Sequence, residues 1–365
     1  MARQPERSIP EGSTSGHVAM DRSRAASNAH VRHRVPKGAM AASLIGAGWM
    51  EWLARLPLWR GALVLAYHRI EGDGTPVLDR GVLSATPSSF DAQMRFITRH
   101  FDVVPVEAIA RDQSSPARRV VVTFDDGYRD NYALALPILR RHGVPAVFFL
   151  ATRFLDGPAV PWWDEIAWMV GRSDRDELEP GDWLDRPLPL RGAGRRAIVV
   201  LTDLYKSLPT DRADAFLDFC GEAMGTGRCG PGEAAELWMT WEMARELRDS
   251  GMAIGGHSAT HPILARSTRD VQAREITECA QRLDEELGVA MRWFAYPVGL
   301  RSAFDETTKD ILRSSGVSLA FSLYGGYVRR RPVDPYDVPR ASVGIDMTSP
   351  AFRAMLTLPG QFARW

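Results

Sequence analysis

The stretch VVVTFDDGYRDNY, Val120 to Tyr132, decides the fold, because it joins a strand-like run to two adjacent aspartates. Its β-branched residues predict a buried strand, and Gly127 lets the chain turn sharply after Asp125 and Asp126. Two neighbouring carboxylates repel each other in a partly desolvated site unless a cation compensates them. A plain turn is the alternative interpretation, since Asp-Gly is common in turns and Asp caps helices well.

Short apolar runs of this kind alternate with helical patterns over most of the chain. Several helical segments end at a glycine where a helix stop is expected, among them Gly143, Gly251 and Gly316. The alternation predicts an α/β fold with a largely parallel sheet, open or closed into a barrel, whose functional groups gather at the carboxyl ends of the strands. The expected strands are ALVLAYH (62–68), DVVPV (102–106), RVVVTF (119–124), AVFFLA (146–151), MAIGG (252–256), RWFAY (292–296) and LAFSL (319–323).

Composition excludes several classes of protein. The chain has 365 residues, and its 45 Lys and Arg balance 45 Asp and Glu, so no overall field attracts nucleic acid. Three cysteines without CxxC spacing disfavour a disulfide framework and favour a reducing compartment. We therefore expect a folded protein of the cytoplasm, without a transmembrane span.

The two ends of the chain differ from its middle. Residues 1–38 are rich in Ser, Arg, Pro and Gly, which predicts a disordered tail. Residues 39–61 predict an amphipathic helical lead-in, too short and too charged to cross a bilayer, with peripheral membrane contact as the weaker alternative. The expected barrel covers residues 62–345, and residues 346–365 form a C-terminal extension.

A second polar cluster lies in HSATHPIL, directly after an expected strand. His257 and His261 are four residues apart, a spacing at which two imidazoles can converge on one ion. Asp125 and Asp126 also follow a strand, so the two clusters together suggest an Asp-His-His set with open coordination positions. Such a set is what metal-assisted hydrolysis requires.

Three motifs carry a resemblance to a known family. TFDDGYRD (123–130), GGHSATHP (255–262) and FAYPVG (294–299) resemble those of the polysaccharide deacetylases, carbohydrate esterase family 4, in the branch with FAYPxG. The resemblance implies a distorted (β/α)7-type barrel that binds one divalent metal, most often Zn2+. It implies that Asp125 is the catalytic base and that Asp126, His257 and His261 are the metal ligands.

Two departures from the family pattern concern the groups that support Asp125. An arginine that often precedes the third motif's proline by two residues is replaced by Ala295. Arg340 in YDVPRASV is the candidate substitute from a later strand, with an ordinary surface arginine as the alternative. No histidine follows His261, although the family usually has a late one as general acid. His68 in AYHRI is the candidate acid, with a buried structural histidine as the alternative.

A third departure is an insertion at about residues 157–236, which contains PAVPWWDEIAWMV and further helix-like segments. Its tryptophans predict either packing onto the barrel or stacking on sugar rings, and Trp162 is the preferred sugar contact. The resemblance implies further substrate contacts at Tyr128, Tyr296 and Pro297. A backbone N–H near Tyr296 or Gly127 is expected to stabilise the oxyanion.

These features predict a metal-dependent hydrolase that removes N-acetyl groups from a polysaccharide, an oligosaccharide or a lipid-linked amino sugar. An O-acetyl esterase or a deformylase acting on a glycan precursor would use the same ligands. A non-catalytic carbohydrate-binding protein is the alternative from a different class, supported by Ala295 and by the missing late histidine.

Overall fold

The computed structural model describes residues 52–72, 78–110, 117–157, 159–329 and 334–362 of the chain. The predicted tail at 1–38 and most of the lead-in at 39–61 lie outside these residues. Within the described part, the lead-in is helical only at residues 52–54. No helix in the described ranges has the length and apolar character that a membrane crossing needs.

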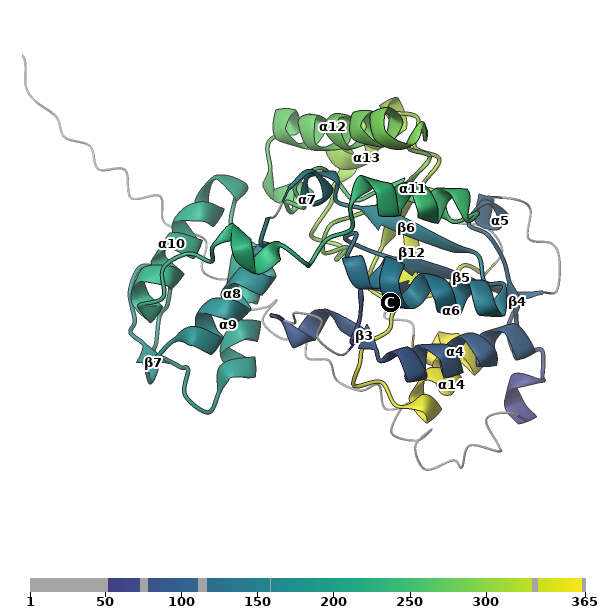
Figure 1. Ribbon diagram of the computed structural model, residues 1–365, viewed down its shortest axis with the longest axis horizontal. Coiled ribbons are helices and arrows are strands. Elements are labelled where there is room, and N and C mark those ends of the chain that lie inside the picture. The colour runs from purple at the N-terminus through teal and green to yellow at the C-terminus, as the bar shows by residue number, and fades with distance from the viewer. Residues whose placement is uncertain (1–51, 73–77, 111–116, 158, 330–333, 363–365) are drawn as a thin grey trace, which may run out of the picture. The chain divides into compact units, whose positions relative to one another are not determined.

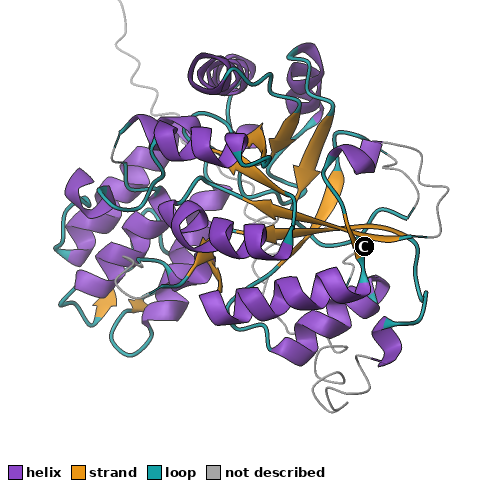
Figure 2. Cartoon of the chain, turned by 45° about the vertical axis from the view of Figure 1, so that its right-hand side comes forward, coloured by secondary structure: helices purple, strands orange, loops and turns teal. Residues whose placement is uncertain are grey.

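A closed barrel of parallel strands forms the centre of the described chain (Figures 1 and 2). The sheet runs β1-β12-β11-β10-β9-β6-β5, and β1 also pairs with β5, which closes the ring. The predicted (β/α)7-type barrel is therefore confirmed. Its strands are β1 (Gly61–Tyr67), β5 (Arg118–Phe124), β6 (Ala146–Leu150), β9 (Ala253–Gly256), β10 (Trp293–Ala295), β11 (Leu319–Ser322) and β12 (Val338–Ser342).

Helices cover the outside of this barrel, as Figure 2 shows. The helical segments predicted to end at Gly143, Gly251 and Gly316 form α6, α11 and α13. Each of these glycines has a positive φ. The helices of the barrel are α4 (Pro87–His100), α5 (Glu107–Ala110), α6 (Leu136–His142), α7 (Thr152–Asp156), α11 (Trp241–Asp249), α12 (Arg269–Leu287), α13 (Glu306–Ser314) and α14 (Ser349–Thr357), and a π-helical turn at Asn131–Ala135 precedes α6.

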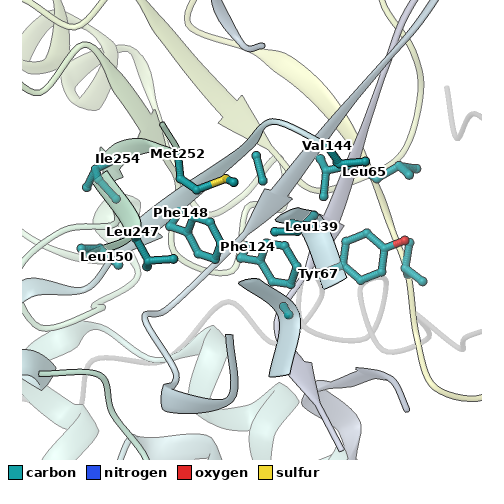
Figure 3. Close-up of a cluster of buried hydrophobic side chains, with 14 of the residues drawn as sticks. Leu65, Tyr67, Phe124, Leu139, Val144, Phe148, Leu150, Leu247, Met252 and Ile254 are labelled. Carbon is teal, nitrogen blue, oxygen red and sulfur yellow. The ribbon is translucent and has the colours of Figure 1, made fainter. Parts of the chain in front are cut away.

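Side chains along the barrel strands point alternately inward and outward, so the strands contribute to two separate cores. In β1, Ala62 and Val64 join a cluster made mainly of strand residues inside the barrel. Leu65 and Tyr67 point the other way and pack with Phe124 and helix residues in the outer cluster (Figure 3). Both faces of the barrel strands are buried, which explains why these strands read as continuous apolar runs.

Two strands differ from the sequence expectation. DVVPV forms only the two-residue β4 (Asp102–Val103), which pairs with β5 outside the ring. Pro105 has no N–H for a ladder and so limits this strand. VPRAS, which contains Pro339 and Arg340, is absent from the apolar runs that predict strands, although a later strand was expected to carry Arg340; it forms β12 and completes the barrel.

The insertion after β6 has a core of its own. Its helices α8 (Trp162–Arg172), α9 (Gly194–Ser207) and α10 (Ala213–Met224) group together in Figure 1, with the short antiparallel pair β7 (Glu177–Leu178) and β8 (Leu188–Pro189). One buried cluster contains residues from all three helices and also Tyr128 and Trp238. Tyr128 stacks on Trp238 with ring centroids 4.6 Å apart, so the turn after β5 is packed into the insertion. The remaining short strands, β2 (Arg69–Ile70) and β3 (Leu83–Ala85), pair with each other.

The buried Asp164 in α8 gives a pH-dependent prediction. Burial raises the pKa of this carboxyl to about 7, although the Asp79 N–H donates to it at 2.8 Å. A carboxyl whose pKa is raised by folding stabilises the fold below its unfolded pKa, and this stability is lost as the pH rises toward 7.

We expect Asp164→Asn to raise the free energy of unfolding at pH 8 by on the order of a few kcal/mol, and by much less at pH 4. Thermal unfolding at both pH values measures this. Asp182→Asn, at an exposed aspartate of the same insertion, is the control and should change neither value. An equal effect of Asp164→Asn at both pH values would contradict the assignment.

Candidate active site

The polar residues of the first two motifs meet at the carboxyl ends of the barrel strands. Asp125 and Asp126 follow the end of β5, and His257 follows the end of β9. Together with His261, they are at least 95% buried. The predicted placement of the two motifs at one end of the barrel is thus present in the structure.

Three of these side chains form a set that fits a metal ion. One ligand atom from each of Asp126, His257 and His261 lies within 4.8 Å of the others. Within the described part of the chain, the Oδ1 atom of Asp126 is buried without a hydrogen-bond partner, 3.2 Å from Nε2 of His257 and 3.5 Å from Nε2 of His261. One carboxylate and two imidazoles match the ligand set of a divalent transition metal such as zinc.

Hydrogen bonding and burial leave both imidazole Nε2 atoms suited to a cation. His257 Nδ1 lies 2.7 Å from the carbonyl oxygen of Ala295, and donation there leaves the Nε2 lone pair facing Asp126. Burial, and then His257, lower the pKa of His261 to about 3. Burial lowers the pKa of His257 as well, but the Asp125 and Asp126 carboxylates outweigh burial and raise this pKa. The two carboxylates therefore favour a positive charge at the His257 ring.

Asp125 has a different partner. Arg340 makes two hydrogen bonds to its carboxylate, Nη1 to Oδ1 at 2.6 Å and Nη2 to Oδ2 at 2.8 Å. Burial alone would raise the pKa of Asp125, but Arg340 and His257 outweigh it and lower the pKa far below its ordinary value. The contact expected between Arg340 and Asp125 is present, and it compensates for Ala295 in the third motif.

His68 lies beside the same carboxylate. Its Nε2 is 3.9 Å from Oδ2 of Asp125, and its side chain is 21% exposed, whereas Asp125 is almost fully buried. Its backbone is held on both sides, since its N–H donates to Ser84 Oγ and its carbonyl accepts from Asn131 Nδ2. His68 is therefore placed between Asp125 and solvent.

Backbone strain is concentrated in the same three motifs. Among the described residues, four that are not glycine have a positive φ: Asp126 at 76°, Ser258 at 64°, His261 at 62° and Val298 at 63°. Such conformations cost free energy and persist where surrounding contacts enforce them, commonly at functional sites. Gly127 adjoins Asp126 with a φ of 95°, as the predicted turn requires.

The predicted substrate contacts need correction. The Trp162 ring is 8% exposed and stacks on Tyr205 in the insertion, with ring centroids 4.3 Å apart. Tyr128 and Tyr296 are at most 1% exposed, and Pro297 is also buried. The cores of the insertion and of the barrel cover these side chains, so they present little exposed surface to a sugar.

The two backbone donors expected to stabilise an oxyanion are also occupied. The N–H of Tyr296 donates to the carbonyl of Phe321 at 3.1 Å, which continues the barrel ladder. The N–H of Gly127 donates to the carbonyl of Asp125 at 3.0 Å. Neither group is free to bind a substrate oxygen.

Two supporting residues had no clear signal in the sequence. Trp163, next to the favoured Trp162, is the tryptophan whose ring contacts His261. Glu275 in α12 holds the loop between the two histidines: its Oε2 accepts from the N–H groups of Ala259 and Thr260 at 3.0 and 2.8 Å, and its Oε1 accepts from Thr260 Oγ1 at 2.7 Å. Only the fold brings α12 against this loop.

The chain is similar to known proteins along most of this barrel. It matches the family model described as "Polysaccharide deacetylase" over residues 112–173 and 201–320. A curated protein of Bacillus subtilis (strain 168), YxkH, which carries the polysaccharide deacetylase name, is 30% identical to it over 92 residues. That stretch is 24% of this chain and 30% of the relative, so the match spans less than a third of the relative's length.

Solved structures share the fold at low identity. IcaB from Ammonifex degensii is 21% identical with a TM-score of 0.50, and the alignment covers 81% of this chain and 96% of that one. The deacetylase PplD from Streptococcus pyogenes, solved in complex with acetate, is 16% identical with a TM-score of 0.51, covering 82% and 97% of the two chains. These two similarities support the barrel architecture.

Glu275 provides a test of the site that does not depend on turnover. We expect Glu275→Ala to weaken metal affinity by about 10- to 100-fold, because the strained loop that carries both histidines loses its carboxylate partner. Competition with a chromogenic chelator measures this affinity. Glu278→Ala is the matched control, since Glu278 lies one turn further along α12 and pairs with Arg153. Equal affinities of the two variants would refute the role of Glu275.

Proposed function

The chain belongs to the polysaccharide deacetylase family, and from this premise we propose that it is a metal-dependent hydrolase that removes N-acetyl groups from an amino-sugar polysaccharide or a lipid-linked precursor. The predicted family is confirmed. The observation that carries the proposal is the buried Asp126, His257 and His261 set beside a separately held Asp125.

We propose that Asp126, His257 and His261 hold the metal, with Zn2+ as the proposed ion, and their close grouping of one carboxylate and two imidazoles supports this. When bound there, a divalent cation lowers the pKa of a water molecule and polarises the acyl carbonyl. The other residues act around that position. Asp125 accepts the proton of the attacking water, because its carboxylate stays ionised and retains free lone pairs beside the two bonds from Arg340.

Arg340 orients this base and reduces its basicity at the same time. Its planar guanidinium fixes both carboxylate oxygens, and further bonds to Thr123 Oγ1 and the Ser322 carbonyl hold the guanidinium itself. The pair keeps Asp125 deprotonated across the neutral range.

His68 is the proposed general acid for the leaving amine. It lies near Asp125 and is partly exposed, so a substrate entering from solvent can reach it. The contacts of Arg340 and His68 with Asp125 weigh against the non-catalytic alternative, because both groups that the motifs lack have substitutes beside the base. An O-acetyl esterase or a deformylase would use the same residues. We also propose a cytoplasmic location.

Acetate release from a panel of N-acetylated and O-acetylated oligosaccharides tests the function. We expect protein reloaded with Zn2+ to release acetate from N-acetylated sugars and metal-stripped protein to release none. Release from O-acetylated sugars alone would replace the proposal by the esterase alternative. No release from any substrate, with sugar binding retained, would support the carbohydrate-binding alternative.

Asp125 should respond differently to mutation from the proposed metal ligands. We expect Asp125→Asn to retain the metal and lose turnover by about 100-fold or more, since it removes only the proton acceptor. His257→Ala should lose both metal and turnover. Metal content measured beside acetate release distinguishes these outcomes, and a fully active Asp125→Asn variant would refute its role as base.

The role of His68 can be separated from a structural one by the choice of leaving group. His68→Gln should slow N-acetyl hydrolysis by about 100- to 10,000-fold, because an amine leaves only with a proton. It should slow hydrolysis of 4-nitrophenyl acetate far less, since nitrophenolate leaves unprotonated. Initial rates on both substrates measure this difference. Equal losses would show that His68 does not act as the acid.

A further inference from the structure

The two histidines of the proposed metal centre are held in different ways. His257 has its Nδ1 hydrogen-bonded to the Ala295 carbonyl, the usual arrangement that fixes the ring of a ligating histidine. The Nδ1 of His261 is buried and has no hydrogen-bond partner among the residues that the structure describes. Its backbone also lies in the left-handed region, with a φ of 62°. Some other contact must therefore fix the orientation of the His261 ring.

Trp163 supplies that contact from the insertion. Its ring centroid lies 4.5 Å from that of His261 at an interplanar angle of 63°, and His257 lies on the same imidazole at 4.8 Å and 69°. The His261 ring is thus packed by two rings, each roughly perpendicular to it. Edge-to-face packing of this kind is attractive and directional.

Trp163 is itself firmly placed. Its Nε1–H donates to the Tyr128 hydroxyl at 2.9 Å, and only 5% of the residue is exposed. Tyr128 follows the ligand Asp126 by two residues and stacks on Trp238. Helix α8 therefore connects the turn that carries one proposed ligand with the imidazole of another.

We propose that Trp163 is a positioning residue of the metal centre, which holds the His261 ring by packing where His257 is held by a hydrogen bond. The inference rests on the proposed function, because it takes Asp126, His257 and His261 as the ligands. It assigns the insertion a part in building the metal centre.

The neighbouring Trp162 gives a matched control. It lies in the same helix, is similarly buried at 8% exposure, and stacks on Tyr205, while its edge-to-face contact with the Trp163 ring, at 5.2 Å between centroids, links it to His261 only indirectly. Replacing either tryptophan removes the same volume from the insertion core. Only replacement of Trp163 removes the ring that packs on His261.

Titration of the metal-free protein with Co2+, followed by its visible absorption, tests the proposal. We expect Trp163→Ala and Trp163→Leu to weaken Co2+ affinity by about 10-fold or more and to change the absorption bands, because the His261 ring loses its fixed orientation. Trp163→Phe keeps an aromatic face and should restore most of the affinity. Trp162→Ala should lower the melting temperature and weaken Co2+ affinity far less than Trp163→Ala, because the Trp163 ring stays on His261 and keeps its bond to the Tyr128 hydroxyl.

Circular dichroism before each titration confirms that the variant is folded. Wild-type affinity and bands in folded Trp163→Ala would overturn the proposal and leave the metal centre intact. If that variant does not fold, equal Co2+ affinities of Trp163→Leu and Trp163→Phe would overturn it. A wild-type protein that binds no Co2+ would overturn the proposed metal centre together with this inference.

Discussion

The buried ion pair between Asp125 and Arg340 is the interaction on which the rest of the site depends. Both side chains are at most 1% exposed, and the guanidinium binds both carboxylate oxygens. Removing one partner of such a pair costs about 3 to 5 kcal/mol, because the other charge remains buried. The pair also links β5 to β12 inside the barrel, on the two sides of β1.

Strand alternation explains why the adjacent aspartates have different partners. Val121 and Val338 point into the barrel, and Asp125 and Arg340 keep the same inward phase further along β5 and β12. Asp126 then takes a φ of 76° at the turn, which directs its carboxylate to the histidines. One carboxylate is thereby neutralised by a fixed guanidinium, and the other remains available for a cation.

Much of this arrangement could be predicted from the sequence. The apolar runs and glycine stops predict the barrel, and the position of the polar motifs after strands predicts that Asp126, His257 and His261 meet. Ala295, which stands where the family often has an arginine, still contributes one contact to the site. His257 is hydrogen-bonded to the backbone carbonyl of Ala295, a contact that needs no particular side chain.

The supporting contacts could not be predicted, since they depend on how distant elements pack. Trp162 and Trp163 are the same residue type at neighbouring positions. They differ in the ring that each contacts, which is Tyr205 for Trp162 and His261 for Trp163. Glu275 resembles any surface glutamate until α12 lies against the histidine loop. The burial of Tyr128 likewise follows from the insertion core that covers it, which the sequence identified only as an extra segment.

The division of tasks between the two aspartates is tested most directly by anomalous X-ray scattering from crystals soaked in Zn2+. The account predicts one peak at the zinc edge, coordinated by Asp126, His257 and His261, with the Asp125 carboxylate still bound to Arg340. A peak coordinated by Asp125, or zinc bound only elsewhere in the chain, would contradict it.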